Sequence, residues 1–462
     1  MLNIAVILVS LSFLIFAAYR GYSVILFAPM AALLAVLLTQ PYVALPMYGT
    51  VFMEKMVTFI KLFFPVFLLS AVFGKFTEAS GMAGSIARMV IRVFGARNAI
   101  PAIVVVGAIL TYGGVSLFVV AFCLYPFAAD LFKTAGIPKR LIPATIALGT
   151  LTFTMDAFPG SPQIQNIIPT TAFHTTTWAA PWLGLAGGTY LCIVGLIYLQ
   201  WQKRKARLAG EGYGTGHINE PEKFSPENLP PVYLAMLPLL LVIVCNKLFT
   251  AVIIKNYSGL FSWPAVGFQG ATQVDLSPFV AVWSVSAAIV VGIIAILLCR
   301  FRHVKNNLKK EINISIGGAL LAMMNTASEY GFGAVIAVLP GFRIIERGMA
   351  SAFKNVLINE AVAITTLSGI TGSASGGMSI ALASMKDGFL ARAAAQGVPN
   401  EVLHRVASMA SGGMDTLPHN SAVLTLLVIT GLTHKQSYKD IFRLTLLKVS
   451  AVFFVIALYY IT

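Results

Sequence analysis

The sequence has few charged residues and only four cysteines, and both shortages limit what the protein can be. Charged residues make up 11% of the 462 positions, against about 25% in a typical soluble domain. The cysteines stand singly in or beside apolar segments, a pattern that does not fit a disulfide framework or a cysteine metal site. Hydrophobic residues make up 58% of the chain, which a water-soluble core cannot hold, so the bilayer must solvate much of it.

Sequence motifs for ATP hydrolysis and for metal-dependent catalysis are also missing. There is no G-x-x-x-x-G-K-[ST] phosphate loop and no H-E-x-x-H motif. Asp156 and Asp415 could suggest an intramembrane aspartyl protease, but a proline follows each of them three residues later and Gly-x-Gly-Asp is absent. We therefore expect a protein that is not an enzyme and that needs no cofactor and no metal.

The net charge is +15, and the positions of the basic residues indicate its origin. The runs 203–207 and 300–310 lie directly beside apolar segments, as cytoplasmic loops of membrane proteins do. Nucleic-acid binding would need these residues gathered on a solvated domain, and the sequence has none. We expect a multi-pass protein of the bacterial inner membrane. Arg20 and the basic residues after His434 place both termini outside.

Seven apolar segments are long enough to cross a hydrocarbon core of about 30 Å as simple helices. One polar stretch, 201–230, is rich in Gly, Glu, Lys and Pro and is typical of a cytoplasmic linker. The seven expected helices are 3–19, 22–39, 57–77, 180–200, 231–253, 277–299 and 443–461.

The most informative feature is an unusual pattern that occurs twice. Gly113-Gly114-Val115-Ser116 precedes Met155-Asp156-Ala157-Phe158-Pro159-Gly160-Ser161, and Gly376-Gly377-Met378-Ser379 precedes Met414-Asp415-Thr416-Leu417-Pro418-His419-Asn420 at similar spacing. Glycine, proline and a lone aspartate interrupt apolar sequence in both copies. Paired interrupted segments in corresponding halves indicate the substrate site of a secondary transporter, because irregular backbone at membrane depth survives only where it lines a protein interior.

We therefore expect an all-α polytopic fold made of two inverted-topology repeats, 1–200 and 231–462. Each repeat would hold a re-entrant hairpin, at about 100–132 and 358–384, although two full crossings remain an alternative for the first. Each would also hold a broken transmembrane helix, at about 141–172 and 400–433. Residues 82–97 and 341–357 would be interfacial amphipathic helices. A scaffold and a mobile, elevator-type transport domain would result.

Two groups of residues are candidates for chemistry. Buried acidic groups in lipid must pair, protonate or face a cavity, although Asp156 and Asp415 could also be helix caps and Glu329 a structural hydrogen-bonding group. Hydroxyls and amides at the interruptions, together with helix N-termini, suit a small carboxylate, although single Ser and Thr residues often bond to their own backbone. The candidate residues at these interruptions include no lysine or arginine. The coupling candidates are Asp156, Glu329, Asp415 and His419. The substrate-binding candidates are Thr111, Gly113, Gly114, Ser116, Ser161, Gln163, Asn166, Thr371, Ser373, Ser375, Gly376, Ser379 and Asn420.

The segment 155–166 resembles a motif of the gluconate:proton symporter family and its related organic-acid permeases. So does the segment 414–423, which continues to Gly431-Leu432-Thr433-His434. The resemblance implies proton-coupled uptake of a small organic anion such as gluconate or 3-hydroxybutyrate, the ion-transporter superfamily fold, and a homodimer. The sequence Phe158-Pro159-Gly160-Ser161-Pro162 looks closer to permeases of hydroxybutyrate or of unassigned substrate than to the gluconate transporters themselves. A sodium-coupled carboxylate symporter, a cation/proton antiporter and a channel remain alternatives.

Overall fold

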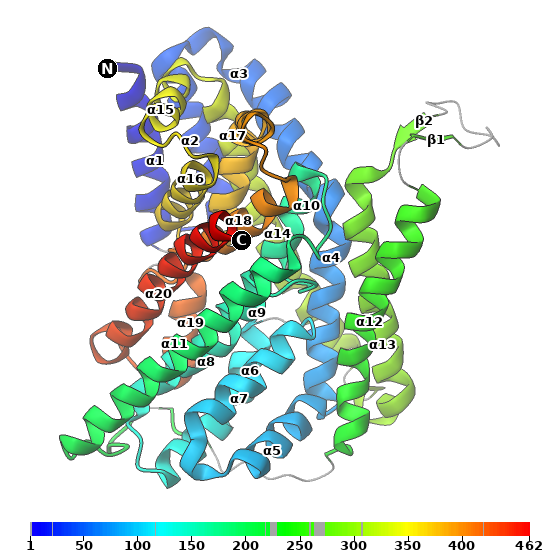
Figure 1. Cartoon of the computed structure of the whole chain (residues 1–462), viewed down its shortest axis with the longest axis vertical. Coiled ribbons are helices and arrows are strands. Elements are labelled where there is room, and N and C mark those ends of the chain that lie inside the picture. The colour runs from blue at the N-terminus through cyan, green and yellow to red at the C-terminus, as the bar shows by residue number, and fades with distance from the viewer. Residues whose placement is uncertain are drawn as a thin grey trace.

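A computed structural model describes residues 2–20, 22–115, 117–217, 219–221, 229–257, 260–262, 273–305, 308–418 and 420–462. The described chain is helical apart from a short hairpin of two strands, β1 (Leu260–Ser262) and β2 (Gln273–Asp275), which projects beyond the helices (Figure 1). Within the described residues, five helices are long and apolar enough to cross a membrane. The expected all-α polytopic fold is confirmed.

Six helices form one packed group, in which two long helices are central and the other four pack around them. The central pair is α4 (Met53–Ala79) and α14 (Leu308–Val338), which come from different halves of the chain and pack on each other. Helix α2 packs on α14, whereas α13 packs on α4 beside α12 at one edge of the molecule (Figure 1). We call this group the scaffold. Its other helices are α1 (Leu2–Tyr19), α2 (Val24–Thr39), α12 (Val232–Tyr257) and α13 (Val280–Lys305).

Two helical hairpins follow the central helices, one in each half. Hairpin 1 is α6 (Ala99–Tyr112) and α7 (Leu117–Thr134), and hairpin 2 is α16 (Val356–Thr371) and α17 (Ala374–Gln396). Hairpin 1 turns at Gly113-Gly114 and hairpin 2 at Gly372-Ser373. Gly114 (φ +98°) and Gly372 (φ +65°) adopt left-handed backbone that glycine accepts without strain.

Each hairpin is followed by a helix that breaks in the middle. The first runs through α8 (Ile142–Thr150), the short α9 (Phe153–Asp156) and α10 (Ile164–Phe173). The second runs through α18 (Asn400–Ser411) and α19 (Ser421–Thr430). The second halves cross over, because α10 packs on α17 and α18 while α19 packs on α7 and α8. The closing helices α11 (Pro181–Leu208) and α20 (His434–Ile461) pack side by side.

Several boundaries differ from the sequence expectations. Helix α11 continues to Leu208, so the first eight residues of the expected linker are helical. Helix α20 begins at His434 rather than 443, because Thr433 and Gln436 form a capping box at its start. The first break begins at Leu151 and includes the short helix α9 before α10 starts at Ile164. Amphipathic helices α5 (Met82–Phe94) and α15 (Pro340–Ala352) precede the two hairpins.

The turn of hairpin 2 also corrects the alignment of the two copies. The sequence comparison pairs Gly113 with Gly376, but Gly376 lies in the first turn of α17 and the chain reverses earlier, at Gly372. The same interval along the chain separates Gly113 from Asp156 and Gly372 from Asp415. The structural equivalent of Gly113 is therefore Gly372, and the repeated Gly-Gly-x-Ser letters occupy different positions in the two hairpins.

Candidate transport site

The two helix breaks meet at a lysine ammonium. Lys448, in the middle of α20, places its Nζ 2.7 Å from Asp415 Oδ1 and 3.6 Å from Asp156 Oδ2. The same ammonium donates to the carbonyl oxygen of Leu151, at the end of α8, over 2.5 Å. All three charged side chains are almost completely buried. One cation therefore joins both breaks and α20 at a single point, which we call the ion cluster (Asp156, Asp415 and Lys448).

The two carboxylates of the ion cluster are not equivalent. Asp415 accepts a hydrogen bond from Lys448, whereas neither oxygen of Asp156 accepts one from any residue that the structure describes. The close approach of Asp156 depends on Gly412, because a Cβ at that position would overlap Asp156 Oδ2. A buried carboxylate without donors is costly as an anion, so Asp156 is the member of the cluster with capacity for another proton or cation.

A second buried cation holds the first break together. The Arg405 guanidinium, on α18, donates to the carbonyls of Ala157 (2.8 Å) and Ala179 (2.8 Å) and to Asn166 Oδ1 (3.1 Å). Ser408 Oγ of the same helix donates to the Asp156 carbonyl over 2.7 Å. These contacts satisfy free carbonyls of the interrupted backbone, and they fix the first break against α18.

An amide side chain after each break holds the nearby hairpin turn. Gln163 Nε2 donates to the Thr111 carbonyl over 2.7 Å, and Asn420 Nδ2 donates to the Gly372 carbonyl over 2.6 Å. Asn420 also caps α19 by accepting from Ala422 N. Contacts therefore run continuously from one hairpin turn through both breaks to the other turn, so the structure brings the four interruptions together.

The two hairpin turns meet different parts of the scaffold. In hairpin 2, Ser375 Oγ lies 3.3 Å from Thr326 Oγ1 of α14, and a Cβ on Gly376 would overlap the carboxylate of Glu329. In hairpin 1, a Cβ on Gly113 would overlap Leu239 of α12, and Gly114 faces Phe73 of α4. Hairpin 2 therefore meets a polar and hairpin 1 an apolar scaffold surface.

Many of the expected substrate ligands are already engaged in the fold. Ser161 Oγ donates to the Thr154 carbonyl, and Asn166 Nδ2 donates to the carbonyls of Ser161 and Thr177. Thr371 bonds to its own helix, and Ser373 caps α17 by accepting from Gly376 N. Among the described residues, the hydroxyls of Thr111 and Ser379 are buried without a partner. Ser116 and His419 lie outside the described residues.

Neither of the two buried cations was expected from the sequence. The interruptions themselves contain no cationic side chain, but Lys448 and Arg405 reach them from α20 and α18. Lys448 had a detectable signal, because it is the one charged residue in the apolar stretch 444–462, and an ionisable residue inside a membrane segment indicates a functional site. Arg405 had a weaker signal, since polar residues surround it in 400–408.

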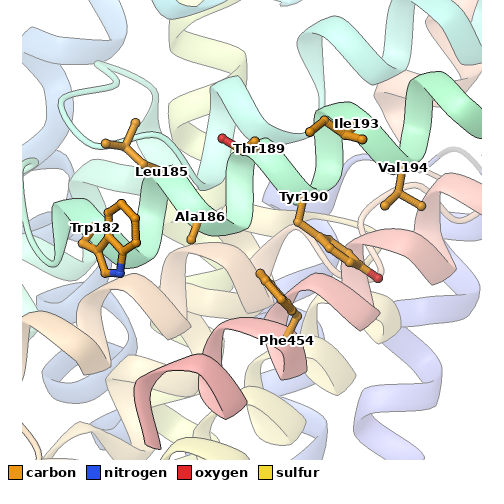
Figure 2. Close-up of a pocket in the computed structure, with 8 residues that line it drawn as sticks. All are labelled: Trp182, Leu185, Ala186, Thr189, Tyr190, Ile193, Val194 and Phe454. Atoms are coloured by element: carbon orange, nitrogen blue, oxygen red, sulfur yellow. The ribbon is translucent and has the colours of Figure 1, made fainter. Parts of the chain in front are cut away.

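A groove of about 440 Å³ lies elsewhere, along α11 and α20. Figure 2 shows Tyr190 stacked beside Phe454 in this groove, with Trp182 farther along α11. Trp182 is 65% and Ile193 52% exposed. The lining is apolar except for Thr189 and the Tyr190 hydroxyl, so the groove suits contact with lipid and not the binding of a small anion.

Interrupted helices around buried charges, in an all-helical multi-pass fold, define a secondary membrane transporter. No family model matches the chain. It is 54% identical over 469 residues to the uncharacterized transporter YxjC of Bacillus subtilis, covering 100% of this chain and 99% of that protein. The chain therefore belongs to the same transporter family as YxjC.

Two solved structures are similar in fold. MtrF of Neisseria gonorrhoeae, described as representing a class of antimetabolite efflux pumps, has a TM-score of 0.50 at 14% identity and covers 89% of this chain and 83% of its own. The YdaH transporter of Alcanivorax borkumensis has a TM-score of 0.47 at 15% identity, covering 89% and 87%. The likeness to MtrF extends to the fold alone.

Proposed function

We propose that the protein is a proton-coupled symporter that moves a small hydroxy-carboxylate, such as 3-hydroxybutyrate or a sugar acid like gluconate, into the cell. The observation that carries the proposal is the ion cluster. Asp156 comes from one break and Asp415 from the other, and both lie within ion-pair distance of Lys448. Charges that join two interrupted helices at depth respond to the binding of an ion and to relative movement of the helices.

Helix N-termini and hydroxyls near the ion cluster support an anionic substrate. Helices α10 and α19 begin at the breaks, and α17 begins at the turn of hairpin 2. The N-terminus of each carries a partial positive charge, and the start of α10 has no side-chain cap. Ser373 at the turn of hairpin 2, Ser375 and Ser379 on α17, and Thr111 on hairpin 1 add hydroxyls for a substrate that itself carries hydroxyls. The motif resemblance to organic-acid permeases supports the same substrate class.

A coupling cation makes uptake of an anion energetically possible. The membrane potential opposes entry of one negative charge by about 2.3 kcal/mol per 100 mV. A proton that travels with the anion cancels this charge, and the inward proton gradient adds further driving force. The sodium-coupled alternative satisfies the same requirement.

The packing supports an elevator-type movement with the hairpins and broken helices as the mobile unit. Helices α6 to α10 and α16 to α19 pack on one another, and the turns of both hairpins rest on scaffold helices. In this proposal the repeats divide near 1–200 and 231–462, and sliding of the mobile unit exposes the site to each side in turn. The homodimer is a further part of the proposal, and light scattering of the purified protein tests it.

Uptake by purified protein in liposomes, against a panel of hydroxy acids with an imposed inward pH gradient, tests the proposed function. We expect accumulation of at least one hydroxy acid, no requirement for sodium, and loss of accumulation in Asp156→Asn and Asp415→Asn. Glu401→Gln, an exposed carboxylate on α18, is the matched control and should transport normally. Uptake that needs sodium at fixed pH, or full activity in both Asp variants, contradicts the proposal.

A further inference from the structure

The position of Lys448 in the ion cluster is that of a bound monovalent cation. Its ammonium is surrounded by three oxygens from two separate breaks, namely Asp415 Oδ1, the Leu151 carbonyl and Asp156 Oδ2. Carboxylate and backbone carbonyl oxygens at a helix break are the donors that coordinate sodium in transporters with discontinuous helices. A covalently attached cation therefore stands where a free one would bind.

The charged groups around the ion cluster determine whether a further cation or proton can bind there. Lys448 compensates one of the two carboxylates, and the shorter contact, at 2.7 Å, is to Asp415. Arg405 on α18 directs its guanidinium to the backbone carbonyls of Ala157 and Ala179 and to Asn166, and His404 beside it contacts Asn166 and Thr175. Neither donates to the Asp156 carboxylate. Among the described residues, Asp156 is therefore the carboxylate of the ion cluster that accepts no hydrogen bond.

The backbone of Gly412 and the Lys448 ammonium both lie close to Asp156 Oδ2. Gly412 has no side chain, and even a Cβ there would overlap Asp156 Oδ2 and lie 2.9 Å from Lys448 Nζ. A sodium ion beside Asp156 would also be repelled by the ammonium, 3.6 Å from the nearest carboxylate oxygen. A proton on the carboxylate needs no additional volume and meets no such repulsion.

We propose that Lys448 is the residue that selects protons over sodium, and that Asp156 is the group that carries the coupling proton. Lys448 occupies the cation position between the breaks permanently, so the ion cluster exchanges only the proton of Asp156 with the solution. Removal of the ammonium leaves two carboxylates and a carbonyl oxygen around an empty position, and this set binds sodium. The inference rests on the proposed function for the meaning of coupling, but the sodium-binding step is measured without substrate.

The test compares thermal unfolding of purified protein in sodium chloride and in choline chloride at equal ionic strength. Lys448→Met keeps the length of the apolar stem and removes the charge. A ligand that binds only the folded state raises the melting temperature, so we expect sodium to raise that of Lys448→Met by at least about 3 °C. The wild type and Lys439→Met, an exposed lysine on the same helix, should show no sodium-specific change.

A double variant locates the sodium response. The double variant Asp156→Asn, Lys448→Met lacks the negative charge of one of the two carboxylates that would bind sodium. Its sodium-dependent rise in melting temperature should therefore be less than half of that in Lys448→Met. A rise that is equally large in the double variant overturns the proposal. So does a sodium response of the wild type that Asp156→Asn abolishes, because Lys448 would then not exclude sodium from the cluster.

The test also covers failure of the variant to fold. If Lys448→Met is recovered as folded protein only when extracted in sodium chloride, sodium replaces the ammonium and the proposal holds. If it aggregates in sodium and in choline alike, or shows no sodium response when folded, the proposal is wrong. Failure of hydroxy-acid uptake in liposomes, with the sodium response intact, would instead reject the proposed substrate and leave the role of Lys448 standing.

Discussion

Hairpin 1 and hairpin 2 have the same architecture but meet the scaffold through opposite chemistry. The turn of hairpin 1 rests on Leu239 and Phe73, whereas the first turn of α17 in hairpin 2 rests on Glu329 and Thr326. Both hairpins need glycine for this close approach. The difference indicates a division of labour, in which hairpin 1 is a packing element and hairpin 2 presents polar groups to a buried carboxylate.

The ion cluster lies between these two surfaces and belongs to neither hairpin. It is formed by the two breaks and α20, and Gln163 and Asn420 connect the breaks to the hairpin turns. Tyr112 of hairpin 1 and Thr365 of hairpin 2 add further hydrogen bonds to the Pro159 and Ala410 carbonyls, so each hairpin is joined to its broken helix at more than one point. The comparison predicts that equivalent changes at the two turns affect different properties, transport at hairpin 2 and stability at hairpin 1.

The largest effect is expected from Gly376→Ala. The new Cβ would overlap the Glu329 carboxyl group, displacing the buried acidic side chain that faces hairpin 2. We expect the initial rate of substrate uptake in liposomes to fall by more than about tenfold, a loss of roughly 1.4 kcal/mol or more. Gly318→Ala on α14, where a Cβ meets no atom within 4 Å, is the control and should keep the wild-type rate.

Removal of the Glu329 side chain distinguishes the effect of Gly376→Ala on stability from its effect on transport. In Gly376→Ala combined with Glu329→Ala, the overlap is gone, so the melting temperature should return toward that of Glu329→Ala alone. Transport should stay lost, because the carboxylate is missing. Recovery of transport to more than half of the wild-type rate would show that Glu329 serves only to fill space.

A smaller effect on transport is expected at hairpin 1. Gly113→Ala would overlap the side chain of Leu239, and overpacking of this kind costs about 1–3 kcal/mol. The melting temperature should fall while transport by the folded protein stays within about threefold of wild type, a barrier change below roughly 1 kcal/mol. Leu239→Ala makes room for the new methyl group, so the double variant should be more stable than the sum of the two single changes predicts. Additive losses would contradict the contact.

The smallest effect on stability is expected from contacts near the ends of the hairpins that lie opposite their turns. Hairpin 2 is held by its preceding loop, through Arg392 to the Phe353 carbonyl. After hairpin 1, the turn that leads into α8 is held to the linker through an ion pair of Lys139 with Glu220 at 2.7 Å. Partial burial opposes the charge of Glu220, but hydrogen bonds from Lys139 and Tyr213 outweigh it and lower the pKa of this carboxyl below 4.5. Its contribution to stability is therefore complete above the pKa of the unfolded chain and is lost as the pH falls through the folded pKa.

Glu220→Gln tests this contact. At neutral pH the variant should unfold at a slightly lower temperature, by less than about 1 kcal/mol in stability, because Glu220 is partly exposed. The difference between wild type and variant should close as the pH falls below 4.5. A difference that stays constant across this pH range would show that the ion pair does not contribute.

The sequence predicted the interrupted helices because glycine, proline and aspartate together disfavour a continuous helix in an apolar segment. It singled out Asp156 and Asp415 as coupling candidates from the same repeated pattern, and the structure places both beside Lys448. It paired Gly376 with Gly113, whereas the chain reverses at Gly372, since repeated letters can occur in different turns. Lys448 escaped notice because it has no counterpart in the first copy of the pattern.

Composition and periodicity alone determined that this chain folds as helices in a bilayer, since 58% hydrophobic residues leave no alternative solvent. They also determined where the helices break, because local backbone preferences of glycine and proline act over a few residues. Only the tertiary structure decided which charges meet. Asp156, Asp415 and Lys448 are far apart in the chain, and their distances depend on how α20 packs across both breaks, which no local pattern encodes.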